Sequence, residues 1–173
     1  MSKASIITNS ATRALGLAEG LLNGIAPERA GRFANGANGP INANHPAFVY
    51  GHLSIYNAMI LGMLGQDASD AAVPDTYEGL FKHGVECVDD TEGSVYPPLE
   101  EAVEHFKRGS AASIAALNAA SDEQLDAPTP DENFRKSFPT VGDAANFLLN
   151  DHVMFHLGQV STWRRAEGLG SAM

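Results

Sequence analysis

Several features that define other classes of protein are scarce in this chain of 173 residues. A single cysteine, Cys87, excludes an internal disulfide framework of the kind found in small secreted domains. No segment has the run of about 18 apolar residues that spans a membrane. The N-terminal segment also lacks the continuous apolar stretch of a signal peptide, because polar residues interrupt it. We therefore expect a cytoplasmic protein with no membrane partner.

Positive charge is also scarce. The chain has 11 lysines and arginines against 21 aspartates and glutamates, a net charge of −10. A nucleic-acid surface needs clustered positive charge, so we expect no nucleic-acid partner. Hydrophobic residues make up 44% of the chain and charged residues only 18%, which excludes a disordered protein. A chain of this length can bury a core, and we interpret residues 1–173 as one domain.

Strong strand signals are absent, whereas apolar residues recur at the steps of three and four that are typical of helices. The long connection 65–96 includes a short helical segment at about 77–83, and a Gly/Asn-rich loop covers 31–44. The pattern predicts an all-α fold, a four-helix bundle with long connections. The four main helices are expected at about 5–22, 46–64, 97–120 and 141–165.

Local signals mark the ends of these elements. Thr140 follows Pro139 and precedes Asp143 by three residues, close to the capping-box pattern that begins a helix. Gly168 lies just beyond the predicted end of the same helix, as expected of a C-terminal cap. The segment 121–125 is expected to form one capped helical turn.

His152 and His156 are the most informative pair of residues. On a helix, positions four apart lie on one face, one turn from each other. The two histidines continue the apolar stripe of Val141, Ala145 and Leu148, so we expect them to face the interior. Two imidazoles placed in this way can bind one divalent metal ion together.

A third histidine lies on a second apolar stripe. The helix that begins near Pro46 places His52 in line with Phe48, Ile55, Met59 and Met63. A buried imidazole needs a polar partner, because an unpaired polar group in a core is costly. A metal ion shared with the first histidine pair would supply that partner.

Two further histidines compete for this role. His45 precedes His52 by seven residues, and His83 lies in the long connection. Either could replace or add to the three ligands, although His45 is better explained as a residue at a helix start. His105 is interpreted as a surface residue. Cys87 is interpreted as a packed or partly exposed thiol, because no base is spaced to activate it.

Three neutral nitrogen ligands would leave positions open on the ion. That is the pattern of catalytic rather than structural zinc sites. Imidazole suits several metals, so zinc, nickel and iron all remain candidates. Gln159 and Asp151 could orient a ligand ring. Asp151 points about 100° away from the adjacent His152 around the helix, so we do not expect it to be a metal ligand.

The motifs Gly51-His52-Leu53 and His152-x-x-x-His156-x-Gly158-Gln159 resemble the DinB-like superfamily. The resemblance extends over nearly the whole chain and includes Ser121-Asp122-Glu123-Gln124-Leu125. It implies a four-helix bundle in which His52, His152 and His156 hold a divalent metal ion. It also implies a homodimer, and similarity to S-transferases and isomerases that use low-molecular-weight thiols.

These observations predict a metal-dependent enzyme that acts on a small molecule, as a thiol-dependent S-transferase or as a hydrolase. A low-molecular-weight thiol would be a partner in the first case. The alternatives are a stress-related protein that binds a metal and a small ligand without turnover, and a metal-free bundle that dimerises as a scaffold. No catalytic residue is assigned. Small residues in helices 5–22 and 97–120 also favour close packing in a homodimer.

Overall fold

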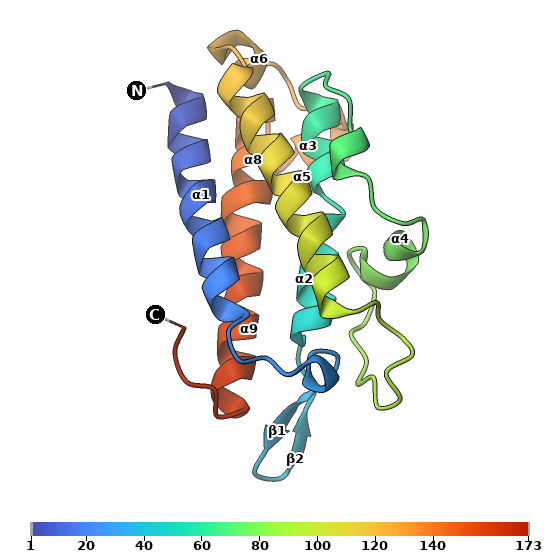
Figure 1. Ribbon diagram of the computed structural model, residues 1–173. Coiled ribbons are helices and arrows are strands. Elements are labelled where there is room, and N and C mark those ends of the chain that lie inside the picture. Colours follow the sequence, from blue (N-terminus) through green and yellow to red (C-terminus); the bar gives the residue numbers. More distant parts are fainter. Residues whose placement is uncertain (1, 173) are drawn as a thin grey trace.

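A computed structural model describes residues 2–172 and shows four helical columns packed side by side (Figure 1). Each column after the first contains a helix that carries or supports the candidate site. The columns are α1 (Lys3–Leu21), α2 (Pro46–Ser54) with α3 (Asn57–Met63), α5 (Leu99–Ala119), and α8 (Val141–Asn146) with a π-helical turn (Phe147–Asp151) and α9 (His152–Ala166). The predicted all-α four-helix bundle is confirmed.

The columns do not simply alternate in direction. In Figure 1, α1 and the α8–α9 column run downward, whereas α2–α3 and α5 both run upward. Two consecutive parallel columns require a connection that returns along the whole bundle. This explains the length of the segment between α3 and α5. The short elements of the chain are the 3₁₀ turns Pro27–Arg29 and Ser69–Ala71, and α4 (Thr76–Phe81), α6 (Asp122–Asp126) and α7 (Glu132–Arg135).

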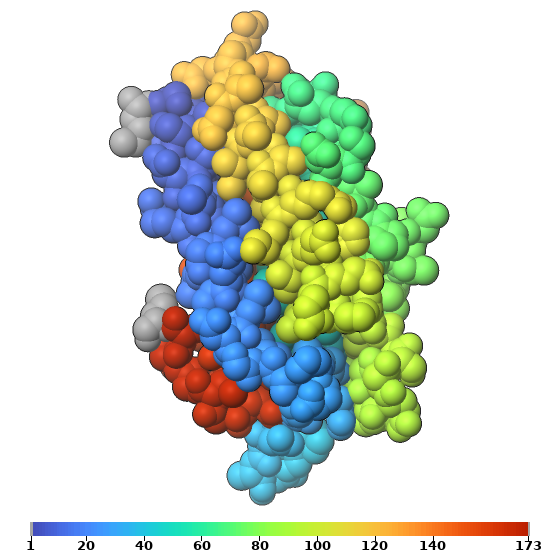
Figure 2. Space-filling view, viewed as in Figure 1, coloured from blue at the N-terminus to red at the C-terminus, as the bar shows by residue number. Residues whose placement is uncertain are grey.

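A small β-hairpin lies where the sequence predicted only a loop. Strands β1 (Ala34–Gly36) and β2 (Gly39–Ile41) pair antiparallel over three residues each. Gly39 has a φ of 118°, a conformation that only glycine adopts readily at the turn. Strands this short carry no detectable alternation of apolar and polar residues. The hairpin projects from the lower end of the bundle, below α1 and α5 (Figure 2).

The predicted continuous helix 46–64 is interrupted between α2 and α3. The Ser54 hydroxyl donates to the carbonyl of Gly51, a bond that often bends helices. The predicted stripe placed Met59 and Met63 on the buried face beyond the interruption. The buried residues of α3 are instead Asn57, Ile60 and Leu61.

Small residues pack inside the bundle. The buried face of α1 is rich in alanine, including Ala11, Ala14 and Ala18. On α5, a Cβ at Gly109 would lie 2.8 Å from the Cβ of Asn57, so glycine lets α5 approach α3 closely. These contacts lie within one chain. Other small residues, including Gly16, Ala111 and Ala115, are exposed, and the homodimer stays a prediction.

The predicted helix starts are confirmed. Thr140 and Asp143 form a capping box, in which each side chain bonds to the backbone N–H of the other. Ser121 and Gln124 form a second capping box at the start of α6.

Candidate metal centre

The π-helical turn sets the orientation of the histidines on α9. A π-helical turn holds one residue more than an α-helical turn, so the core-facing positions shift by one residue along the chain. The buried positions of the π-helical turn are Leu148, Leu149 and Asn150, and those that follow include Val153, His156 and Leu157. His156 is buried, as the stripe from Val141 predicts, and His152 is half-buried beside it.

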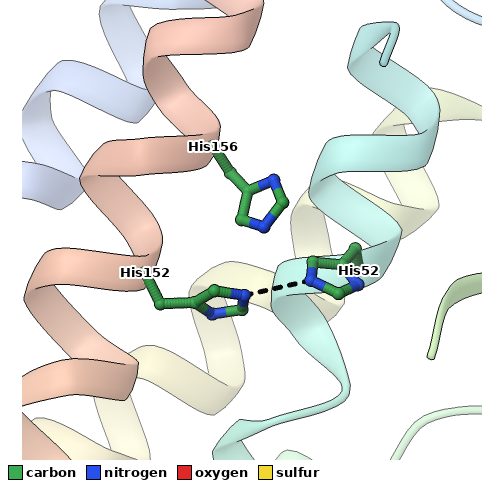
Figure 3. Close-up of side chains that lie close together, drawn as sticks. All are labelled: His52, His152 and His156. Carbon is green, nitrogen blue, oxygen red and sulfur yellow. Dashed lines mark hydrogen bonds between the residues drawn. The ribbon is translucent and has the colours of Figure 1, made fainter. Parts of the chain in front are cut away.

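The three predicted histidines come together between two columns. Figure 3 shows His52 on one helix facing His152 and His156 on the other. The Nε2 atoms of His52 and His152 are 3.0 Å apart, and the three ring centroids are separated by 4.5–5.0 Å. One nitrogen from each ring lies within 4.8 Å of the other two, a cluster that could hold a metal ion.

His52 is oriented by a close approach between α4 and α2. Its Nδ1 atom lies 2.5 Å from the carbonyl oxygen of Phe81, so this nitrogen must carry the proton and donate it. The approach depends on Gly51, because a Cβ there would lie only 2.4 Å from the Phe81 ring. Glycine next to the histidine therefore fixes the tautomer that leaves the Nε2 lone pair free.

His156 is oriented by an amide. Its Nδ1 atom lies 2.9 Å from Oε1 of Gln159, which also accepts a hydrogen bond of 3.0 Å from Asn44 Nδ2. The amide oxygen can only accept, so the histidine donates from Nδ1 and its Nε2 lone pair is free. The predicted orienting role of Gln159 is consistent with this contact. Sequence analysis missed Asn44, which lies in a loop with no periodic pattern.

Aromatic rings surround the cluster. Phe48 stacks on His52 at 6.0 Å, and Tyr56 meets the edges of His52 and His152 at 5.1 and 5.0 Å. Burial lowers the pKa of His52 from 6.5 to about 4 and that of His152 to about 3, and it also lowers the pKa of His156. The rings are therefore neutral at physiological pH, the form that binds metal.

The donor set fits a divalent ion. Two nitrogens bound to one ion at ~2.1 Å lie about 3.0 Å apart at a right angle and about 3.4 Å apart at a tetrahedral angle. The separation of 3.0 Å between the nitrogens of His52 and His152 matches this range. Nδ1 of His152 is buried without a hydrogen-bond partner among the described residues. That ring is held by packing against Tyr56 and Phe147.

The cluster faces a cavity of about 590 Å³. Residues of α2, α9 and the segment after α4 form its walls, with Lys82 and Asp151 as charged groups. Phe155 also lines it and is 67% exposed. Asp151 makes no hydrogen bond to the three histidines among the described contacts, so it lines the cavity and does not orient a ring.

The remaining histidines lie outside the cluster. His45 is fully buried, and its Nδ1 caps α2 by accepting the N–H of Phe48, while its Nε2 donates to the carbonyl of Val88. Both ring nitrogens are therefore used. His83 is exposed and lines the cavity wall. His105, on α5, packs against Tyr77.

Cys87 is a packed thiol. It is 6% exposed, and burial raises its pKa to about 11. A protonated thiol is a poor nucleophile, in agreement with the prediction that Cys87 is packed and unreactive. Trp163 is a core residue whose indole N–H donates to the carbonyl of Arg32.

Replacement of His45 by Ala is expected to lower stability without loss of metal. The change leaves the buried Phe48 N–H without a partner, which costs about 1–3 kcal/mol, and also removes the bond to the carbonyl of Val88. Urea unfolding should show the loss, and metal analysis of the folded variant should match the parent. A variant that folds but loses its metal would place His45 in the site.

Replacement of Gln159 by Leu is expected to weaken metal binding about 10- to 100-fold, the usual effect of losing a group that orients a ligand ring. The leucine keeps the size of the side chain but accepts no bond from His156. Competition with a fluorescent zinc chelator measures the change. Asp151→Asn, at the cavity wall, is the matched control and should bind as the parent does.

The fold and the site together define a helical bundle with three converging neutral histidines, a cluster able to hold a divalent ion. The sequence profile of the DinB superfamily matches residues 11–160, and the chain belongs to this superfamily. No curated protein and no solved structure matches the chain significantly. None of the helices in the described part of the chain is both long and apolar enough to cross a membrane.

Proposed function

We propose that this protein is a metal-dependent enzyme acting on a small molecule, with one divalent ion held by His52, His152 and His156. The observation that carries the proposal is the convergence of three neutral rings beside an open cavity. Their hydrogen bonds to Phe81 and Gln159 direct two Nε2 lone pairs into the cluster. Zinc, nickel and iron all suit three imidazoles.

The composition of the cavity wall limits the types of reaction that the site favours. Among the described lining residues there is no serine, threonine or cysteine, and Cys87 is buried elsewhere. The described wall of this cavity therefore offers no serine, threonine or cysteine nucleophile, and we expect the nucleophile to enter as a co-substrate or as water. When bound, a divalent ion lowers the pKa of a thiol or water. This favours a thiol-dependent S-transferase or a hydrolase.

The side chains around the cluster have separate roles in this proposal. Gln159 and the Phe81 carbonyl keep two ligand rings in the metal-binding tautomer. Phe48 and Tyr56 keep bulk water away from the rings. Lys82 supplies positive charge at the cavity wall for an anionic group of the substrate. A homodimer and a cytoplasmic location belong to the same proposal.

The test begins with protein purified without a histidine tag. Metal analysis is expected to find about one divalent ion per chain. Thiol-conjugation and ester-hydrolysis screens should then detect turnover that a chelator abolishes and added zinc, nickel or iron restores. Circular dichroism should show that the chelated protein stays folded, because a bundle of this size does not need a metal to fold.

Other outcomes would change the proposal. Turnover that persists in fully chelated, folded protein would place the active site elsewhere. A protein that binds the ion and small ligands tightly, with no turnover in either screen, would favour the non-catalytic binding protein. A protein that binds no divalent ion at all would favour the metal-free scaffold.

A further inference from the structure

A second cavity adjoins the metal centre. It has a volume of about 250 Å³ and lies between the hairpin, which contributes Ala34 and Ile41, and α9, which contributes Phe155, Gly158 and Trp163. No charged residue lines it among the described residues. Lys82 and Asp151, the charged groups of the first cavity, do not reach it. We refer to this second cavity as the apolar groove.

The apolar groove adjoins the cavity at the metal centre. Phe155 and Gln159 line both spaces. Gln159 also bonds to His156, so the groove begins one residue contact away from a proposed metal ligand. From His156 to Trp163 the helix rises about 10 Å. A molecule that reaches from the histidines into the groove is therefore elongated.

Gly158 forms the floor of the groove, in the middle of α9. Glycine destabilises the interior of a helix relative to alanine. A Cβ at this position would meet nothing within 4 Å, so no part of the protein itself requires glycine there. Gly16 in α1 is equally open but lies outside the groove. Of the described glycines inside helices that have nothing within 4 Å of a Cβ, which are Gly16, Gly62, Gly79 and Gly158, only Gly158 lines either cavity.

We propose that the apolar groove binds the apolar tail of an amphipathic small molecule whose polar head lies at the metal centre. The head position rests on the proposed function, whereas the tail position rests on the groove alone. Phe155, which is 67% exposed, lines both cavities. In this proposal its ring contacts the ligand's alkyl chain where that chain passes from one cavity to the other. The ligand class is an alkyl or arylalkyl compound with a metal-binding head.

Alkyl hydroxamates of increasing length are the probes: acetohydroxamate, hexanohydroxamate and decanohydroxamate. Calorimetry on zinc-loaded protein should show affinity that rises up to about fourfold for each methylene that is buried. Trp163 is the single tryptophan of the chain and lines the groove. Its fluorescence should change with the two longer probes and not with acetohydroxamate.

Gly158→Leu fills the groove, and Gly16→Leu is the matched control on another helix. Gly158→Leu should bind acetohydroxamate as the parent does but lose at least tenfold affinity for decanohydroxamate. Gly16→Leu should keep the full dependence on chain length. Affinities that do not depend on chain length, or an equal loss for all three probes in Gly158→Leu, would overturn the proposal.

Chelated protein separates the two proposals. Chain-length dependence that is the same with and without zinc would support the groove and count against the metal centre. Zinc-dependent binding that ignores chain length would support the centre and overturn the groove, and no binding at all would overturn both. Light scattering covers the remaining occupant, a second copy of this chain. If Gly158→Leu changes the molecular mass and leaves probe affinities unchanged, the groove is a subunit contact and the proposal fails.

Discussion

Replacement of His152 by Ala is expected to reduce divalent metal affinity by more than about a hundredfold. Loss of a supporting hydrogen bond alone weakens metal sites about 10- to 100-fold, and loss of a ligand should exceed that. Metal analysis after gel filtration and competition with a zinc chelator measure the effect. His105→Ala removes a histidine away from the cluster and is the control, with the full metal content expected.

The same variant separates metal binding from folding. Nδ1 of His152 is buried and has no partner in the described part of the chain, so removal of the ring also removes an unsatisfied polar atom. We expect the metal-free His152→Ala protein to unfold in urea at a concentration close to that of the metal-free parent. Full metal retention in the folded variant would disprove the three-histidine assignment. A variant that fails to fold would show that the ring packing against Tyr56 is structural.

The metal-free protein is expected to lose stability as the pH falls below 6.5. Burial lowers the pKa of His45 and His52 to about 4 and that of His152 to about 3. Between pH 6.5 and 4 the unfolded chain therefore binds protons that the folded chain does not, and protons favour unfolding. Each such ring costs about 1.4 kcal/mol per pH unit. Three rings together cost about 6 kcal/mol at pH 5 and about 10 kcal/mol at pH 4, comparable with the stability of an ordinary domain, so we expect an unfolding midpoint between about pH 4 and 5.

Circular dichroism of chelated protein between pH 8 and 3 tests this directly. Zinc-loaded protein should unfold at a lower pH, because the ion binds only the folded state and only neutral rings. The ordinary histidine pKa of 6.5 would predict loss of the ion below about pH 6. The lowered pKa values move that loss toward pH 4–5. An acid transition unaffected by zinc would mean that the ion does not bind these histidines.

Helix geometry predicted two parts of the cluster and left His45 and His83 as alternatives, and the family resemblance supplied the set of three histidines. The four-residue spacing of His152 and His156, and the position of His52 in an apolar helix, follow from helix geometry. The partners of these rings could not be predicted. Phe81 and Asn44 lie in segments without periodicity, and the tertiary fold alone brings them to His52 and Gln159.

The helix boundaries show the same division. The capping box at Thr140 is local chemistry, and the sequence predicts it correctly. The interruption after Ser54 accompanies a bond from its hydroxyl to the carbonyl of Gly51, and the π-helical turn before His152 is held by the bond from Asn150 to α1. Helix propensity does not distinguish five residues in a π-helical turn from five in an α-helix. The apolar stripes predicted from the sequence are therefore displaced at these two places and correct elsewhere.

The π-helical turn sets the angular position of every residue that follows it in the last column. Asn150 within it donates to the carbonyl of Ile7, which fixes the turn against α1. If the same five residues wound as an ordinary α-helix, everything downstream would rotate by about 100°. His152 and His156 would then point away from His52 although every residue of the cluster remained. The capacity for metal thus depends on the winding of a five-residue segment that contributes no ligand.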